Sequence, residues 1–521
     1  MTRTQGLVGL VLLAGIAGAI LTRHGDTAAR PSGHVTRQAT GRGTGAIAET
    51  VTVGVQPINM QVDEQTGRAF VLNNGDSSVS VLDTRTGALL GTTPLKSPRS
   101  GPVAAAMTVD PRAGRVVVMN QDKSVSVLDA RTDRLVYTVP SGGASEQVVV
   151  NTRTGRIFVS NWGDFAVSPR RPDVDMFKGG NTITVLDTRS GRHVGTIHVN
   201  GNPSTMAVNE RTGRVFVYSD GDGFPGYTKL VSTLDGASGR LLRAVAVAHD
   251  PRGQHPSQGA GDIVVDEQSG RVFVSSPYAE SVSMLDATSG RLLRAVGGTH
   301  PGPIAVDTHP GPIAVDTHTR RVFVLNGGSG TSNGTVSILD SATGRVLGST
   351  PVGRLALPVT PVVDMRTGRV FVANDGGGTG SVSVLDARSG ALLRTVTVGP
   401  HPFAMAVDGR SGRVFVTSLG AMDAAGYLTG PGSVSVLDAR GGALLRTLPV
   451  GVEPAVIAVD EHAGRAFVVN VAGNSSTDAF ALVRPVLPFA PRPATPCNNY
   501  GQVSVRCHYA PGSVTVLDAA R

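Results

Sequence analysis

The side chains best suited to ligand contact are aromatic rings that lie beside carboxylates in long insertions of the chain. Three of these insertions span residues 161–181, 219–229 and 418–432. They contain Trp162, Asp164, Phe165, Asp220, Asp222, Phe224, Tyr227 and Tyr427. An apolar ring next to an acidic group is suited to hold a sugar, a peptide or a cation. We predict that these eight residues form a binding surface; in the alternative interpretation, the rings only fix the insertions to the fold.

Histidines that precede a proline are the main candidates for metal ligation. They include His255, His300 and His401. Imidazoles gathered from several segments can bind a metal, but here the position is simply the one before a recurrent proline. Asp220 and Asp222 resemble part of a calcium loop, without the further oxygen ligands that such a loop needs. We therefore predict no cofactor and no metal site, with these histidines as the weaker alternative.

The two cysteines, Cys497 and Cys507, lie in a fourth, proline-rich insertion at residues 471–512. Their spacing predicts a disulfide in an exported chain, with reactive or metal-bound thiols as the alternative. The C-x-x-C-H motif of a c-type haem site is absent. Residues 330–334 fit G-x-S-x-G but lie in a glycine-rich turn and not between a strand and a helix, so we predict no serine hydrolase.

These candidates are positioned by a unit that recurs nine times along the chain. The copy at residues 368–399 contains the runs VFVAN, SVSVLD and LLRTVTV, and a fourth run, such as PFAMAVD at residues 402–408, begins each unit. Apolar residues at alternate positions between Gly-, Asp- and Ser-rich turns are typical of half-buried antiparallel strands. Four-stranded units at a period of roughly 50 residues predict the blades of a β-propeller.

The two ends of the repeat array predict a closed ring. The segment at residues 48–63 aligns with residues 393–408, so the folded part starts with a fourth strand, whereas the last repeat stops after its third strand at residue 518. We predict an all-β fold, a single closed β-propeller of nine four-stranded blades over residues 46–521, in which the N-terminal strand completes the last blade. Rings of seven or eight blades are the alternatives.

The repeat motifs also resemble the YVTN-repeat, YncE-like propeller family. Its units run as a Pro-started inner strand, G-x-x-x-Y-V-T-N, V-S-V-I-D and a terminal V-G. Here GRVFVAN at residues 368–374 and SVSVLD at residues 381–386 correspond, with Phe in place of the Tyr. The resemblance covers about residues 46–521 and implies an architecture, not a reaction.

Two recurrent residue types are interpreted as structural. One position of the second strand is Phe in eight units, which indicates packing between sheets: Phe70, Phe158, Phe216, Phe273, Phe323, Phe371, Phe415 and Phe467. The Asp that ends each third strand precedes a Ser/Thr-Gly turn and can accept backbone N–H bonds. Residues 300–317 are a perfect tandem copy of nine residues, for which we have no functional interpretation.

The charge balance argues against a nucleic-acid-binding function. The net charge is +8 and the isoelectric point is near 9.9. However, nearly all of the basic residues are Arg, and most of these Arg lie in the recurring turns beside aspartates. We expect them to form a solvated rim and not a groove.

The N-terminal segment predicts export. Residues 1–22 contain an apolar run that suits either a signal peptide or a membrane anchor, and we favour the anchor. Residues 23–45, rich in Arg, Thr, Gly and Ala, predict a flexible linker. The membrane contact is expected through this N-terminal segment only, and the propeller is expected to be extracytoplasmic.

Taken together, the residues favour a non-catalytic binding or scaffold module that uses its variable loops to hold a protein, peptide or glycan ligand at the cell surface. The first alternative is an enzyme of the propeller lactonase or lyase type, with a metal or a His/acid pair in the central channel. The second is a partner of redox proteins, because the fold resembles haem- and quinone-enzyme propellers. The unit-starting segments supply few acids, Glu146, Asp262 and Glu453 among them, and this favours binding over catalysis.

Overall fold

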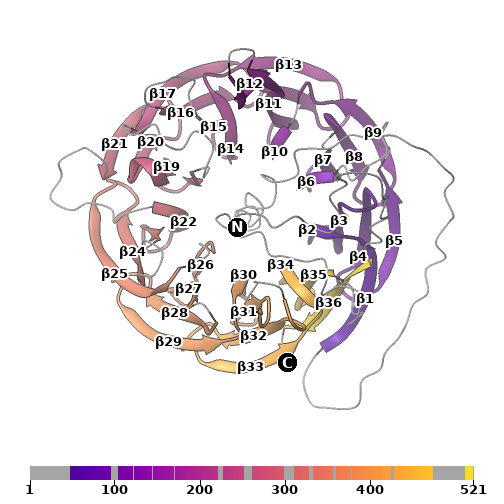
Figure 1. The fold of residues 1–521 in the computed structure, drawn as a ribbon, viewed down its shortest axis with the longest axis vertical. Coiled ribbons are helices and arrows are strands. Elements are labelled where there is room, and N and C mark those ends of the chain that lie inside the picture. The colour runs from indigo at the N-terminus through magenta and orange to yellow at the C-terminus, as the bar shows by residue number, and fades with distance from the viewer. Residues whose placement is uncertain are drawn as a thin grey trace.

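The computed structural model describes residues 47–95, 104–120, 122–143, 145–168, 171–220, 227–250, 261–297, 310–327, 333–355, 359–376, 378–423, 428–472 and 511–519. They form nine four-stranded antiparallel sheets, which are arranged as blades around a ring (Figure 1). Blades 1 to 8 follow the chain as β2–β5, β6–β9, β10–β13, β14–β17, β18–β21, β22–β25, β26–β29 and β30–β33, and blade 9 contains β34, β35, β36 and β1. The nine-bladed prediction is confirmed.

Each blade begins at the centre of the ring. The first, innermost strands are β2 (Pro57–Asp63), β6 (Ala104–Asp110), β10 (Ser145–Asn151), β14 (Asn202–Asn209), β18 (Ile263–Asp266), β22 (Pro310–Asp316), β26 (Val362–Asp364), β30 (Pro402–Asp408) and β34 (Val452–Asp460). The second strands are β3 (Arg68–Asn73), β7 (Arg115–Asn120), β11 (Arg156–Ser168), β15 (Arg214–Asp220), β19 (Arg271–Ser276), β23 (Arg321–Asn326), β27 (Arg369–Asp375), β31 (Arg413–Ser418) and β35 (Arg465–Ala472).

The other two strands of each blade lie towards the circumference. The third strands are β4 (Ser78–Asp83), β8 (Ser124–Asp129), β12 (Arg171–Asp187), β16 (Tyr227–Asp235), β20 (Ser281–Asp286), β24 (Asn333–Asp340), β28 (Gly380–Asp386), β32 (Ser433–Asp438) and β36 (Pro511–Asp518). The outer strands are β5 (Leu89–Pro94), β9 (Leu135–Pro140), β13 (His193–His198), β17 (Leu241–Asp250), β21 (Leu292–Gly297), β25 (Val346–Arg354), β29 (Leu392–Val398), β33 (Leu444–Pro449) and β1 (Ile47–Val55). A 3-10 turn, η3 (Pro277–Ala279), joins β19 and β20.

The ring closes where the sequence predicts. Strand β1 pairs antiparallel with β36, with Thr50 opposite Thr515 and Val51 opposite Val514. The first strand of the folded part is therefore the outer strand of the last blade. Its pairing covers the edge of β36 that would otherwise be unpaired. We call the contact between blade 9 and blade 1 the closing boundary.

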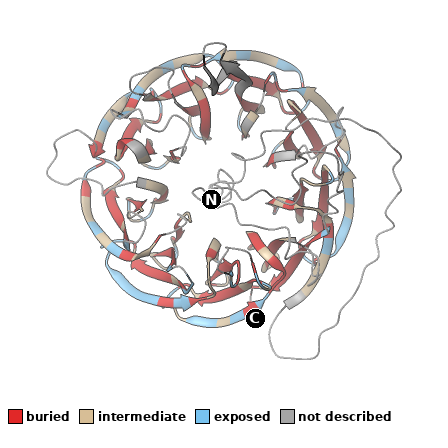
Figure 2. Ribbon diagram, in the orientation of Figure 1, coloured by how far each residue is buried: buried red, intermediate tan, exposed pale blue. Residues whose placement is uncertain are grey.

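The apolar core lies between neighbouring blades. Phe70 and Leu72 of blade 1 pack in one cluster with Met107, Val116 and Val118 of blade 2. All eight phenylalanines of the second strands are fully buried, as predicted. Buried residues line the middle strands of every blade, whereas exposed residues lie on the outer strands (Figure 2). Each blade therefore buries its two faces against two neighbours, which is the reason that the units do not fold as separate domains.

Asparagine at the end of the second strand satisfies the buried hydroxyl groups of the third strand. In blade 1, Asn73 Nδ2 donates to Ser78 Oγ (2.9 Å) and Ser80 Oγ (3.0 Å). Blade 2 repeats the contacts with Asn120 at the same position. Because a buried hydroxyl without a partner is costly, the Ser-Val-Ser-Val pattern and this Asn depend on each other.

We distinguish two ends of the ring. The turn face carries the tight turns between first and second strands and between third and outer strands, for example residues 64–67 and 84–88. The loop face carries the connections between second and third strands and between successive blades, for example residues 74–77 and 399–401. In a meander of antiparallel strands, alternate connections lie at the same end.

Candidate functional site

The insertion at residues 161–181 is a β-hairpin that extends blade 3 at the loop face. Strands β11 and β12 stay paired beyond the blade, with Gly163 opposite Gly179, Phe165 opposite Phe177 and Val167 opposite Asp175. Among the described second and third strands, these two are the longest, with 13 and 17 residues. The sequence predicts an insertion here, but only the structure shows that its two arms pair as a regular hairpin.

The predicted binding residues are only partly placed. Trp162, Asp164 and Phe165 lie on β11, Asp220 ends β15 opposite Lys229, and Tyr227 begins β16. Other predicted residues lie outside the described residues: Asp222, Phe224 and Tyr427 of the binding surface, His255 and His300 of the weak metal candidates, and Cys497 and Cys507. The binding surface and the disulfide therefore stay predictions. Of the tandem copy, the second half forms β22, and the first half also lies outside the described residues.

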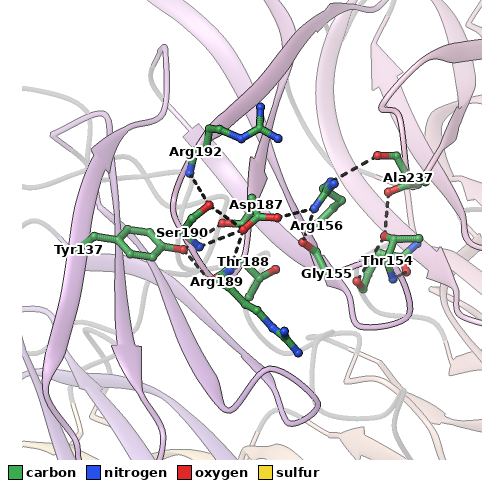
Figure 3. Close-up of polar contacts among 12 residues, drawn as sticks. Tyr137, Thr154, Gly155, Arg156, Asp187, Thr188, Arg189, Ser190, Arg192 and Ala237 are labelled. Carbon is green, nitrogen blue, oxygen red and sulfur yellow. Dashed lines mark hydrogen bonds and ion pairs between the residues drawn. The ribbon is translucent and has the colours of Figure 1, made fainter.

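The recurring Thr-Gly-Arg turns connect neighbouring blades. Figure 3 shows one example between blades 3 and 4. Arg156 Nη1 pairs with Asp187 Oδ2 of its own blade (2.6 Å), and its Nε donates to the carbonyl of Ala237 in the next blade (3.3 Å). Thr154 Oγ1 donates to the carbonyl of Gly236 (2.8 Å). The side chain of Arg156 is partly exposed and is held by these contacts, so this class of arginine connects blades as well as lying at the solvated rim that we predict.

The aspartate that ends the third strand is held by its turn in blades 1 to 8, as predicted. Asp187 Oδ1 accepts hydrogen bonds from the amide of Ser190 (3.0 Å) and from Ser190 Oγ (2.7 Å). Burial alone would raise the pKa of Asp187, but these bonds and the charge of Arg156 outweigh burial and lower the pKa below its usual value. The side chains of the Arg–Asp pair are thus already used for structure, and this argues against a phosphate-binding groove.

Glutamates on the turn face connect neighbouring blades at the turns that follow the inner strands. Glu210 of blade 4 accepts hydrogen bonds from the amides of Thr152 (2.8 Å) and Arg153 (3.0 Å) in blade 3. The same contact recurs for Glu267 with the amide of Glu210 (2.6 Å), Glu461 with that of Gly409 (3.0 Å) and Glu64 with that of Glu461 (3.2 Å). These acids are therefore structural.

Asp262, which directly precedes β18, has a similar role at the inner strands. Its Oδ2 accepts a hydrogen bond from the amide of Ile313 in the next blade (2.9 Å). Burial raises the pKa of Asp262 to about 6, although the amides of Ile313 and Ile263 oppose the rise. This contact between two inner strands accounts for an Asp at position 262 without a catalytic role.

The residue before the inner-strand proline defines a second group on the loop face. Gln56, His401 and Glu453 take this position in blades 1, 8 and 9, which are consecutive around the ring, and all three adopt left-handed φ values of 49°, 52° and 55°. Such backbone angles are costly outside glycine, so the surrounding fold must impose them. Three consecutive blades therefore carry an amide, an imidazole and a carboxyl side chain at the same position, directly before the proline of the inner strand on the loop face.

His401 and Glu453 have the environments of acid–base groups. His401 Nδ1 lies 3.1 Å from Asp375 Oδ2, at the end of β27 in blade 7. Glu453 is half-buried, but its Oε2 is enclosed and has no hydrogen-bond partner among the described residues. Burial raises the pKa of Glu453 to about 7. An imidazole oriented by a carboxylate and a carboxyl that titrates near neutral pH can transfer protons.

Sequence analysis identifies His401 and Glu453 but not Asp375. The only signal for Asp375 is an acid directly after the strand-ending Asn374, where blades 1 and 2 have Asn74 and Gln121. We call Asp375, His401 and Glu453 the loop-face polar group.

Comparisons with known proteins agree with the fold. A family model described as outer membrane protein assembly factor BamB matches residues 75–330, just under half of the chain. No curated protein matches the chain. Among the described residues, no helix is long and apolar enough to cross a membrane.

Three solved structures illustrate the similarity. A eukaryotic initiation factor is 12% identical with a TM-score of 0.51, and 77% of this chain and 89% of that chain are covered. BamB from Moraxella catarrhalis is 15% identical with a TM-score of 0.46, with 71% and 96% covered. Quinohemoprotein alcohol dehydrogenase from Comamonas testosteroni is 14% identical with a TM-score of 0.49, with 90% and 75% covered. At these identities the similarity shows the β-propeller fold alone, and it does not distinguish the YVTN-repeat group from other propellers.

Proposed function

We propose that this propeller is a non-catalytic binding module that holds a protein or peptide partner through its loop face, outside the cytoplasm. The observation that carries the proposal is the β11–β12 hairpin, which stays paired from Gly163–Gly179 to Ser168–Arg171 beyond the blade. A regular two-stranded extension has a main-chain edge at which a strand of a partner can pair. Trp162 and Phe165 lie on this extension and are the residues we expect to contact the ligand.

The structural role of the acidic side chains outside the hairpin supports binding over catalysis. Acids at the inner strands and the turns after them, such as Glu210, Glu267 and Asp262, accept backbone hydrogen bonds from a neighbouring blade. The apolar run in residues 1–22 supports export. The match to a model named for an outer membrane assembly factor supports the same location and a scaffold role.

The proposal is tested by shortening the hairpin. Residues 164–178 are replaced by Asn-Gly, which forms a two-residue turn between Gly163 and Gly179. The full chain and the shortened variant are applied to peptide and glycan arrays, with Arg440→Ser on the exposed turn face as the matched control. We expect peptide binding by the full chain and the control, and loss of binding in the shortened variant. Binding that survives shortening, or binding to glycans only, contradicts the proposal.

A second candidate function is proton-transfer catalysis at the loop-face polar group, of the lactonase or lyase kind. It is supported by the pair His401–Asp375 and by the enclosed carboxyl of Glu453. Hydrolysis of a panel of lactones is measured for the full chain and for His401→Gln and Glu453→Gln. Turnover that falls at least about 100-fold in both variants supports the enzyme, and turnover that is absent from the full chain contradicts it.

A further inference from the structure

A cluster of metal-ligating side chains lies at the closing boundary, on the turn face. Glu64 of blade 1 meets Asp460 and His462 of blade 9, and one ligand atom from each lies within 4.8 Å of the others. His462 Nδ1 is 3.0 Å from Glu64 Oε2. These three residues are outside the loop-face polar group and outside every site that the sequence predicts.

Asp460 is a buried carboxylate with a free ligand atom. It is 1% exposed, and its Oδ1 accepts hydrogen bonds from the amides of His462 and Ala463, both at 2.9 Å. Its Oδ2 has no hydrogen-bond partner within the described part of the chain.

Some of the other turns satisfy this second oxygen with a threonine hydroxyl, whereas Asp110 and Asp408 leave it without a partner among the described residues. Thr66 donates to Asp63 Oδ2 (2.9 Å), and Thr367 donates to Asp364 Oδ2 (2.7 Å). In blade 9 the corresponding residue is Ala463, which has no hydroxyl. Asp460 Oδ2 therefore keeps lone pairs that can bind a cation.

The histidine is specific to this boundary. Where Glu210, Glu267 and Glu461 make the same contact, the third residue of the neighbouring turn is an arginine: Arg153, Arg211 and Arg410. An arginine cannot ligate a cation and repels it. At the closing boundary that residue is His462, whose side chain is 74% exposed, and Glu64 beside it is 38% exposed. A cation can therefore reach the cluster from solvent.

We propose that Glu64, Asp460 and His462 bind a divalent transition-metal ion, Zn²⁺ in particular, across the closing boundary. One imidazole nitrogen and two carboxylate oxygens, with water in the fourth position, match the ligands that Zn²⁺ accepts. The ion replaces the hydrogen bond between His462 and Glu64, and binding releases the imidazole proton if one is present. Since its ligands come from both ends of the ring, the ion stabilises the closed ring.

The chain provides a matched control. His318 takes the same turn position in blade 6 and is exposed, but the next blade presents Met365 there instead of a glutamate. His318→Gln therefore removes an equivalent imidazole without touching the proposed site. His462→Gln removes the ligand from an exposed position and leaves the fold intact.

The test uses the full chain with ZnCl₂ as the only added ligand and with EDTA as the reference. We expect Zn²⁺ to raise the Tm of the full chain and of His318→Gln, but not of His462→Gln. Equilibrium dialysis should show one Zn²⁺ fewer per chain, or an affinity at least about tenfold weaker, in His462→Gln. An unchanged Tm of the full chain, or equal binding by the two variants, overturns the proposal. Neither result bears on the hairpin or on the loop face.

Discussion

Arg68 of blade 1 forms its ion pair with Asp133 of blade 2, whereas the corresponding arginine of seven other blades pairs with the aspartate that ends its own third strand. Asp133 stands at a turn position that is Gly87 in blade 1 and Gly191 in blade 3, and it adopts a left-handed φ of 61°. Blade 2 thus exchanges a permissive glycine for an ionic contact with its neighbour.

The exchange predicts two opposing effects at residue 133. Asp133→Gly removes a left-handed non-glycine residue, which stabilises by about 1 kcal/mol, and loses a partly exposed ion pair of about 0.2–1 kcal/mol. We expect a net change within about 1 kcal/mol of zero. Asp133→Ala keeps the backbone cost and loses the pair, so it should destabilise by about 0.2–1 kcal/mol. Thermal unfolding of both variants, alone and combined with Arg68→Ala, measures the coupling energy between Arg68 and Asp133. If Asp133→Gly and Asp133→Ala change the stability equally, the left-handed backbone at residue 133 has no cost.

Tyr137 connects blades 2 and 3 through its hydroxyl. The hydroxyl donates to the carbonyl of Thr188 (2.8 Å), and burial raises the pKa of Tyr137, so the group stays protonated (Figure 3). Tyr137→Phe keeps the ring against Gly191 and leaves that carbonyl unpaired. We expect a loss of about 1 kcal/mol, measured by urea unfolding. Tyr137→Leu, which also loses the ring, should cost more; if the two variants are equal, the hydroxyl contributes nothing.

The third-strand aspartates predict sensitivity to acid. The pKa is lowered from its ordinary value of 3.8 in seven of them: Asp83, Asp129, Asp187, Asp235, Asp286, Asp340 and Asp386. A lowered pKa means that the unfolded chain binds the proton more readily, so the stabilisation is present above about pH 4 and is lost as the pH falls below it. Each group is close to solvent and contributes less than about 1 kcal/mol. The Tm of Asp187→Asn should approach that of the native chain as the pH falls to 3, and parallel curves would contradict this.

Glu453 predicts the opposite pH dependence. Its pKa is raised from 4.5 to about 7, so the folded chain holds a proton that the unfolded chain releases, and stability falls as the pH rises from about 4.5 through 7. Glu453→Gln removes the cost of ionising an enclosed carboxyl. We expect this variant to be more stable by about 1–3 kcal/mol at pH 8 and unchanged at pH 4.5. A destabilising effect at pH 8 would mean that the carboxylate has a partner.

Closure of the ring predicts that β1 supports the whole protein. Val53 of β1 is 6% exposed and packs with Val71 of blade 1 and Val514 of blade 9. Val53→Asp buries a charge there and should lower the Tm of the complete ring by several degrees, whereas Thr52→Asp, on the exposed side of the same strand, should leave it unchanged. A local effect, with the main unfolding transition unmoved, would show that closure is not needed.

The sequence alone determined the blades because their information is local. Alternation within SVSVLD and the tight turns between strands determine each strand, and nine copies determine the number of blades. Closure was also predictable, because residues 48–63 carry the pattern of a fourth strand. The eight phenylalanines were correctly assigned to the core for the same reason.

Only the tertiary structure decided which polar residues meet. His401 and Asp375 are 26 positions apart and belong to different blades, and His462 and Glu64 are 398 positions apart. Arginines and aspartates at equivalent repeat positions have the same local sequence. The sequence therefore does not distinguish Arg68, which pairs with the neighbouring blade, from Arg156, which pairs within its own blade. Contacts between blades depend on how curved sheets stack around a ring, and that geometry is not encoded in any single unit.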